Sequence, residues 1–345
     1  MSQQDDDDVD EAPHPREATA LFGHRAAEAA LVAAYRAGRM PHGILIAGPR
    51  GIGKATLAYR IARFILNHPD PAARAVQDAT SLQVDATNPV ARRVAAQAQP
   101  DLLVIERTVN ERGVLRNQIA VDDIRRTVPF FGSTAGEGGW RIAIIDAVDD
   151  LNRSGANALL KVLEEPPQRG LLLLIAHSTA RVPPTLRSRC RIIALRPSGQ
   201  EDVAAALTAA AGGGIDEARI AAAAAAADGS VARALTMLDE DALTLREQAL
   251  EILGRLPAVE PADLHLLGDA LAGTDPQPLA AFLDTVNAWL SQRLASDHGD
   301  LALLNRLAEA SEHINAAARD AEIYNLERKP LVFNVFGLLA EATRG

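Results

Sequence analysis

A glycine-rich segment that ends in a lysine could bind phosphate. It reads Gly48-Pro49-Arg50-Gly51-Ile52-Gly53-Lys54-Ala55-Thr56 and follows a short apolar run. Glycines let backbone N–H groups close around phosphate oxygens, a helix N-terminus adds a favourable dipole, and a lysine supplies a mobile cation. The alternative is a glycine-rich turn with an unrelated lysine. The predicted phosphate-binding residues are Gly48, Gly51, Gly53, Lys54, Ala55 and Thr56.

The residue after this lysine argues against efficient hydrolysis at the same site. Ala55 stands where loops of this kind carry a serine or threonine hydroxyl for magnesium, and Thr56 comes one position too late to replace it. We therefore expect a weak or vestigial ATP site that binds magnesium only together with nucleotide.

A carboxylate at the end of a second apolar run belongs to the same chemistry. Asp146 follows Ile142–Ile145, at the position from which ATPases help to hold magnesium, and the next residue is usually a glutamate that polarises water. Here that residue is Ala147. We interpret Asp149 and Asp150 as solvated charges at a helix start, with a substitute base as the alternative. Two absences thus fall on one reaction, which favours a nucleotide-site fold kept for architecture.

A basic segment near the end of the same region could act on a different phosphate. Pro183-Pro184-Thr185-Leu186-Arg187-Ser188-Arg189-Cys190 precedes the last predicted strand, and the prolines favour a short helix that presents its arginines at the edge of the domain. The alternative for Arg189 is a surface salt bridge. Cys190 fits a small buried residue better than a reactive thiol.

With these residues the chain resembles the clamp-loader branch of the AAA+ ATPases. Ser188, Arg189 and Cys190 match the Ser-Arg-Cys motif of that family, and the segment at 157–167, Asn-Ala-Leu-Leu-Lys-Val-Leu-Glu-Glu-Pro-Pro, is similar to its motif after the acidic strand. The pair Asp146-Ala147 resembles the family's non-motor subunit, because the motor subunits gamma and tau keep Asp-Glu. The match covers roughly 18–240 well and the rest only by length and character.

The resemblance implies a role for three further side chains. Arg189 would reach across a subunit boundary to the γ-phosphate of ATP bound next door, where a guanidinium stabilises the transition state. Thr179 is placed near the polar position that senses the γ-phosphate, with an exposed polar turn as the alternative. Arg233 resembles the sensor arginine of the helical domain, with a solvated helix face as the alternative.

The resemblance does not extend to a zinc module. Many relatives carry four cysteines after the first helix, but the corresponding stretch, Asn67–Pro100, has none, and Cys190 is the only cysteine of the chain. A disulfide within the chain and a cysteine zinc site are excluded, and the histidines show no ligand spacing. We predict no resident metal and interpret Asn67–Pro100 as an insertion or long loop.

The elements that position these residues follow from short apolar runs separated by helical patterns. We predict buried strands at Ile44–Ala47, Leu102–Ile105, Ile142–Ile145, Leu171–Ala176 and Ile192–Leu195, and helices that include Thr56–Leu66 and Ser154–Leu163. Such alternation is typical of parallel strands with crossover helices. With the resemblance, the predicted fold is an α/β P-loop NTPase (AAA+) domain with a parallel five-stranded sheet, then a small helical lid and an all-helical collar.

The predicted domain organisation follows changes in composition. Strand patterns stop after Arg196-Pro197, and alanine-rich or amphipathic stretches follow, broken by glycines at 212–214 and by prolines. Six of the first eleven residues are acidic, without apolar periodicity. The predicted parts are a disordered acidic tail at 1–17, the α/β domain at 18–197, the lid at 198–240 and an oligomerisation domain at 241–345.

Composition limits the remaining classes of function. A net charge of −10 disfavours a protein that grips DNA over its whole surface. The chain has no apolar run of about 18 residues and no basic leader with an apolar core, so we expect a cytoplasmic protein without membrane contact. Nucleoid or replisome association is implied by the resemblance.

The function that the resemblance implies is structural and regulatory. The chain would be a subunit of the DNA polymerase III holoenzyme, a nucleotidyltransferase complex, with absent or weak ATPase activity of its own. Its implied partners are the gamma/tau and delta subunits, the sliding clamp, and primer–template DNA through the complex. The alternatives are an active ATPase motor of the gamma/tau type and a stand-alone nucleotide sensor without a DNA role.

Overall fold

The computed structural model describes most of the chain. The described residues are 14–108, 116, 118–132, 139–210, 215–238, 240–273, 276–296, 300–323 and 326–344. The chain divides into two compact units, Met1–Ala232 and Arg233–Gly345.

One parallel sheet organises the first unit. Within the described residues it contains five strands in the order β2-β3-β4-β1-β5. The strands are β1 (Gly43–Ala47), β2 (Leu102–Glu106), β3 (Arg141–Asp146), β4 (Gly170–Ala176) and β5 (Arg191–Ala194). All four neighbouring pairs are parallel, with Ala47 level with Ala176 and Asp146 level with Ile175. The five predicted strands and the predicted α/β class are confirmed.

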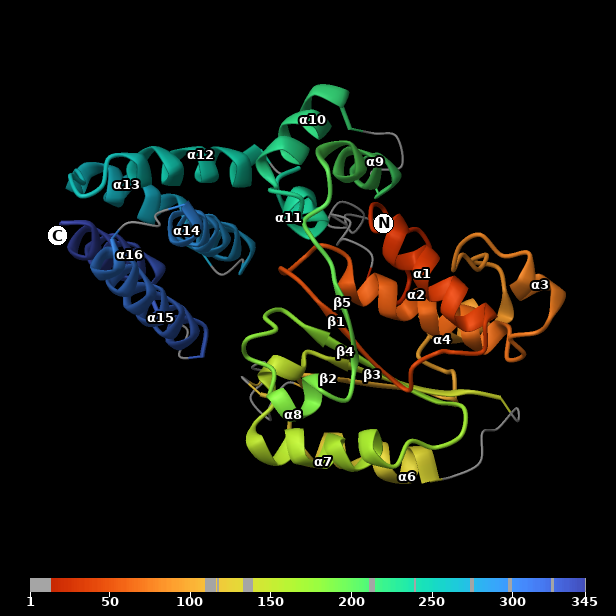
Figure 1. Cartoon of the computed structure of the whole chain (residues 1–345). Coiled ribbons are helices and arrows are strands. Elements are labelled where there is room, and N and C mark those ends of the chain that lie inside the picture. The colour runs from red at the N-terminus through yellow and green to blue at the C-terminus, as the bar shows by residue number, and fades with distance from the viewer. Residues whose placement is uncertain are drawn as a thin grey trace, which may run out of the picture. The chain divides into compact units, whose positions relative to one another are not determined.

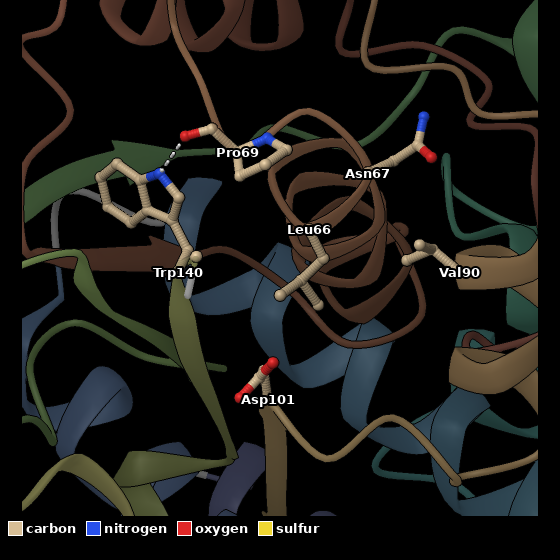
Figure 2. Close-up of a pocket in the computed structure, with 7 residues that line it drawn as sticks. Leu66, Asn67, Pro69, Val90, Asp101 and Trp140 are labelled. Atoms are coloured by element: carbon tan, nitrogen blue, oxygen red, sulfur yellow. Dashed lines mark hydrogen bonds between the residues drawn. The ribbon is translucent and has the colours of Figure 1, made fainter. Parts of the chain in front are cut away.

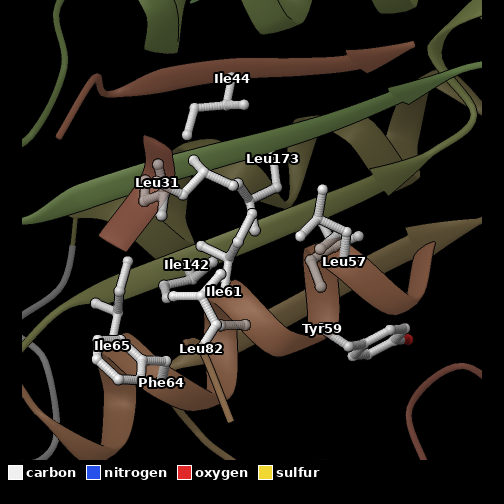
Figure 3. Packing of buried hydrophobic residues seen from close by; sticks show 14 of the residues in the cluster. Leu31, Ile44, Leu57, Tyr59, Ile61, Phe64, Ile65, Leu82, Ile142 and Leu173 are labelled. Atoms are coloured by element: carbon white, nitrogen blue, oxygen red, sulfur yellow. The ribbon is translucent and has the colours of Figure 1, made fainter. Parts of the chain in front are cut away.

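Helices cover both faces of this sheet, as Figure 1 shows. On one face lie α1 (Arg25–Arg36) and α2 (Lys54–Asn67). Figure 3 shows how α2 packs: Leu57 and Ile61 point towards Ile142 and Leu173 of the central strands. The apolar residues of α2 recur at helical spacing, which is why this helix was predictable from the sequence.

The opposite face of the sheet carries a second set of short elements. These are α5 (Val121–Arg125), α6 (Thr127–Gly132), the 3-10 turn η1 (Val148–Asp150), α7 (Arg153–Glu164) and α8 (Pro184–Arg187). Ala156, Leu159 and Leu163 of α7 pack in one cluster with Leu172 and Leu174 of β4. Burial on both faces explains why the central strands read as unbroken apolar runs.

The stretch Asn67–Pro100 is more ordered than the loop interpretation expected. It contains α3 (Arg74–Gln77) and α4 (Pro89–Ala95), and Val76, Val84 and Val94 are buried in the same core cluster as α2. Asn88 caps α4, because its side chain accepts the N–H of Val90 at 2.8 Å. The segment therefore extends the core.

The predicted acidic tail is described only in its last residues. Residues 1–13 lie outside the described residues, whereas 14–17 form a turn. The buried Arg63 side chain donates to the carbonyl oxygen of Arg16 at 3.0 Å and to that of Ala18. These contacts hold the segment at 16–18 against α2, so the described end of the tail is ordered.

The chain after β5 is helical in the described residues of both units. The first unit contains α9 (Gln200–Ala210) and α10 (Glu217–Ala226), which pack on each other, so the alanine-rich stretch is a packed helix. After α11 (Val231–Thr236), the second unit contains α12 (Glu240–Gly254), α13 (Pro261–Ala270), α14 (Pro276–Ser296), α15 (Leu301–Ile323) and α16 (Arg328–Thr343). Phe282 and Phe336 are fully buried at its centre. The expected helical C-terminal region is confirmed, and the predicted boundaries at 197 and 240 stay predictions.

No helix among the described ranges is long and apolar enough to span a bilayer.

Candidate functional site

The glycine-rich loop joins the carboxyl end of β1 to the first turn of α2. The order of strand, loop, lysine and helix is the predicted one, since β1 ends at Ala47 and α2 begins at Lys54. Gly51 has a φ of +75°, a conformation that side chains rarely adopt. A Cβ at this position would also run into the side chain of Ser230, so only glycine fits here.

A segment far along the chain lies against this loop. The backbone N–H of Ala232 donates to the carbonyl oxygen of Gly51 at 3.1 Å, and an added Cβ on Gly51 would lie 2.9 Å from the Ala232 methyl group. The ring of His24 contacts the carbonyl oxygen of Ile52 through Nε2 at 2.7 Å. The loop is therefore held by protein groups on two sides.

Lys54 is buried within this loop, with only 4% of its surface exposed. Its ammonium group donates to the carbonyl oxygen of Pro49. Burial lowers the pKa of Lys54 to about 8, and the negative charges of Asp146 and Asp149 oppose that shift. The cation required for a phosphate is present and lies among carboxylates, although it is bonded to its own loop.

Asp146 lies at the end of β3, as predicted. Burial raises the pKa of this carboxyl group to about 6, the charge of Lys54 lowers it, and Glu106 raises it further. The following residue, Ala147, is 3% exposed. A glutamate at 147 would have to occupy space that the structure fills with protein.

The interpretation of Asp149 and Asp150 as solvated charges is wrong. The Asp149 carboxylate is buried and accepts the backbone N–H of His177 at 3.1 Å and that of Ser178 at 3.2 Å. Asp150 forms an ion pair with Arg107 at 3.4 Å, and only 10% of its side chain is exposed. Asp149 thus ties the turn after β3 to the turn after β4.

His177 lies with Lys54 and Asp149 in this cluster, although it is not among the predicted site residues. Burial lowers its pKa to about 4, and the positive charges of Lys54 and Arg50 lower it further. Its Nδ1 atom is buried and has no hydrogen-bond partner among the described residues. The signal was available, because His177 directly follows β4, where parallel strands end beside the loop. Thr179 lies two residues further on and is exposed.

Arg189 lies apart from this cluster, one residue before Cys190 and two before β5. Its side chain is 38% exposed, and its Nη2 atom lies 2.8 Å from Glu164 Oε1 at the end of α7. Nη1 donates to the carbonyl oxygen of Thr185 at 3.0 Å. The surface salt bridge weighed for this arginine is present, and the guanidinium remains accessible. Burial raises the pKa of Cys190 to about 11, as expected of an unreactive thiol.

Comparison with known protein families gives one clear match. Residues 23–199, just over half of the chain, match the family described as DNA polymerase III, delta subunit. The chain belongs to this family. The matched range contains the loop, the acidic strand, the segment with Glu164 and the Ser-Arg-Cys motif, so the resemblance to the clamp-loader branch rests on the residues described above.

Curated relatives of this delta-family chain carry related names. DNA polymerase III subunit delta' of Pseudomonas aeruginosa is 37% identical over 149 residues, which are 43% of this chain and 41% of that protein. The delta' subunit of Escherichia coli is 27% identical over 296 residues, 84% of this chain and 82% of that protein. The alignment with the Pseudomonas protein thus spans less than half of that relative. These names confirm the delta-prime type of the family for this chain.

Solved structures with a similar chain path include two from Thermotoga maritima. A DNA polymerase III, gamma subunit-related protein is 16% identical with a TM-score of 0.41, covering 91% of this chain and 99% of that one. A variant of RuvB is 17% identical with a TM-score of 0.45, covering 89% of this chain and 88% of that one.

The residues of the glycine-rich loop are suited to binding a phosphate and less suited to binding magnesium. The positive-φ glycines and Lys54 form the donor set of a phosphate site. Ala55, however, packs against the apolar core cluster, and its methyl group supplies no oxygen ligand. Within the described ranges, no group of three or more His, Cys, Asp or Glu side chains is placed to hold a metal ion.

Arg233, the predicted sensor arginine, is the first residue of the second compact unit and lies in α11. The glycine-rich loop belongs to the first unit, so the sensor role of Arg233 stays a prediction.

A separate cavity opens at the amino-terminal edge of the sheet (Figure 2). It has a volume of about 220 Å³ and is lined by Leu66, Asn67, Pro69, Val90, Asp101, Gly139 and Trp140. The Trp140 ring donates through Nε1 to the carbonyl oxygen of Pro69 at 3.2 Å. Because the glycine-rich loop follows the carboxyl end of β1, this cavity lies at the opposite edge from the loop.

Proposed function

We propose that the chain is a delta-prime-like, non-motor subunit of a DNA polymerase III clamp loader. In this role it supports the ATP-dependent loading of the sliding clamp onto primed DNA during chromosome replication. Its own contribution to the chemistry is Arg189, given in trans to an ATP molecule held by a neighbouring subunit.

The observation that carries this proposal is a contrast between two cations. Lys54, in the chain's own loop, is 4% exposed and bonded to Pro49. Arg189 is 38% exposed and lies two residues after the end of the short helix α8. A group that acts on another chain's phosphate has to be accessible at the surface, and Arg189 meets that condition.

A guanidinium suits this task because it is planar, permanently charged and offers five N–H donors to phosphate oxygens. Charge that develops on the transferred phosphoryl group is stabilised by such a residue, worth about 10³- to 10⁵-fold in rate in other phosphoryl-transfer systems. Loss of Arg189 is therefore expected to lower the rate of ATP hydrolysis by the neighbouring subunit.

The chain's own loop has a more limited role in this proposal. Gly48, Gly51, Gly53 and Lys54 hold the phosphates of a weakly bound nucleotide, and magnesium enters only with that nucleotide. Hydrolysis is absent or weak, because Ala55 offers magnesium no hydroxyl and Ala147 offers water no base. Asp146, Thr179 and Arg233 complete the predicted nucleotide contacts.

The proposed partners are the gamma/tau and delta subunits, the sliding clamp, and primer–template DNA through the assembled complex. Gamma and tau subunits are themselves among the relatives: the tau subunit of Escherichia coli is 25% identical over 308 residues, 88% of this chain and 40% of that protein. The helical region from 241 onward supplies the oligomeric contacts, and the complex works in the cytoplasm at the replisome.

Reconstitution with the companion subunits tests the proposal. DNA-stimulated ATP hydrolysis is compared between loaders that contain the wild-type chain and loaders that contain Arg189→Ala, with assembly verified by size-exclusion chromatography. The proposal expects intact assembly and a large loss of rate. Magnesium-dependent turnover by the isolated chain would instead support a motor subunit, and a monomer that ignores its companions would support a stand-alone sensor.

A further inference from the structure

Among the described residues, Glu164 makes the shortest polar contact with the Arg189 side chain. The distance from Arg189 Nη2 to Glu164 Oε1 is 2.8 Å, while Nη1 donates to the Thr185 carbonyl oxygen at 3.0 Å and lies 3.4 Å from Ser188 Oγ. Glu164 approaches from α7 and Thr185 from α8. Residues of two different helices, α7 and α8, therefore contact the Arg189 guanidinium.

The end of α7 that carries Glu164 is fixed against the sheet. His42, just before β1, contacts the carbonyl oxygen of Leu163 through Nε2 at 3.1 Å. The Leu163 side chain is buried on the sheet. The position of Glu164 is therefore set by the core of the domain.

Gly43 brings the Arg189 segment close to the same place. A Cβ on Gly43 would lie 2.7 Å from Leu163 Cδ2, 3.2 Å from Cys190 Sγ and 3.4 Å from the Arg189 carbonyl oxygen. The end of α7 and the segment at 189–190 therefore both pack over the first residue of β1. This packing aligns the two charged side chains.

The exposure of the ion pair between Glu164 and Arg189 argues against a large contribution to the free energy of unfolding. Half of the Glu164 side chain and 38% of the Arg189 side chain are exposed. Exposed pairs of this kind contribute little to the free energy of unfolding. An arginine side chain, however, has large rotamer freedom, and a carboxylate that restricts it limits the directions in which the guanidinium can point.

We propose that Glu164 is a positioning residue that orients the Arg189 guanidinium before it meets a neighbour's phosphate. This inference rests on the in-trans role of Arg189 proposed above. The contacts to Glu164, Thr185 and Ser188 use three of the five N–H donors of the guanidinium, which leaves two for phosphate oxygens. The pair therefore persists when the phosphate is bound, and orientation is set in advance.

The first experiment measures the order of the Arg189 side chain in the isolated full-length chain. Heteronuclear ¹⁵N relaxation of its Nε–H group is compared between the wild type, Glu164→Gln and Glu165→Gln. Glu165 is the matched control, because it is the next residue, also exposed and also acidic. We expect greater mobility in Glu164→Gln alone. Equal mobility in the two variants would overturn the proposal.

The second experiment measures ATP hydrolysis by the reconstituted loader with the same variants. Glu164→Gln is expected to lower kcat by about three- to tenfold with KM for ATP unchanged, since only orientation in the transition state is lost. Glu164→Asp should recover part of the rate, and Glu165→Gln should stay within about twofold of the wild type. A rate that rises in Glu164→Gln would show that Glu164 restrains Arg189, and would overturn positioning.

The two failures can be told apart by Arg189→Ala. If that substitution leaves the rate unchanged, the in-trans role itself is wrong. If it removes most of the rate while Glu164→Gln behaves like Glu165→Gln, the in-trans role stands and positioning by Glu164 is wrong.

Discussion

The Asp149 carboxylate accepts the backbone N–H of His177 at 3.1 Å and so joins two turns at the carboxyl edge of the sheet. The contact is buried, and a second N–H, that of Ser178, reaches the same carboxylate at 3.2 Å. Hydrogen bonds to a charged acceptor are stronger than those between neutral groups. This carboxylate therefore holds the candidate site in shape.

Replacing Asp149 tests that structural role. Asp149→Ala leaves two N–H groups without their acceptor, and we expect a loss of about 3 kcal/mol in the free energy of unfolding. Asp149→Asn keeps one oxygen acceptor and should lose less. Urea denaturation of the full chain measures both. Asp122→Ala is the control, because its exposed pair with Arg125 is worth at most about 0.5 kcal/mol. Equal losses at 149 and 122 would contradict the assignment.

Gly51 offers a test of how tightly the loop is packed. Gly51→Ala places a methyl group against Ser230 and Ala232, whereas Gly38→Ala has a similar positive φ but nothing within 4 Å. The second variant isolates the backbone strain, about 1 kcal/mol. We expect Gly51→Ala to lose clearly more stability than Gly38→Ala in thermal unfolding. Matching losses would mean that the segment at 230–232 does not press on the loop.

Ala147 tests whether the missing base can simply be restored. Ala147→Glu puts a carboxylate at a position that is 3% exposed, and burial of an unpaired charge costs about 3 kcal/mol or more. We expect a marked fall in the melting temperature and no gain in ATP hydrolysis. Ala180→Glu, at an exposed position, should change neither. A stable Ala147→Glu variant that hydrolyses ATP would contradict the inference that the packed position 147 cannot accommodate a glutamate.

Asp146 gives the fold a dependence on pH with a defined sign. Its pKa of about 6 in the folded chain exceeds the value of 3.8 in the unfolded chain, so the folded state binds more protons between these values. The contribution of Asp146 to the free energy of unfolding is fully present below pH 3.8. It is lost as the pH rises to about 6, and the loss is at most about 3 kcal/mol.

The comparison of wild type with Asp146→Asn isolates this effect. His177, whose pKa is lowered to about 4, works in the opposite direction over an overlapping range, so the difference between the two proteins is the quantity to measure. Chemical denaturation from about pH 4 to about pH 7 should show the wild type losing stability relative to Asp146→Asn. A difference that does not vary with pH would contradict the raised pKa.

The sheet and its main helices were predictable because their signals are local. The apolar runs at 44–47, 142–145 and 171–176 are strands buried on both faces, and each predicted end lies within one residue of the observed one. The strand–loop–lysine–helix order was equally readable, since the glycines and the lysine follow one another within a short stretch of the chain.

The contacts that hold the site together were not predictable in the same way. The position of Asp149 depends on its distance from the turn after β4, 28 residues away, and charge pattern alone suggested solvation. The two helices of Asn67–Pro100 are short and take their burial from α2, so periodicity was weak. Asn88 followed by Pro89 was a usable helix-start signal there.

The most direct test of the central claim is the rate of DNA-stimulated ATP hydrolysis by a loader that carries Arg189→Ala. Arg191→Ala serves as the control, because it removes the same charge from an exposed position two residues away. With assembly intact, we expect a loss of about 10³-fold for Arg189→Ala and little change for Arg191→Ala. A rate equal to that of the wild type in an assembled Arg189→Ala loader would contradict the claim.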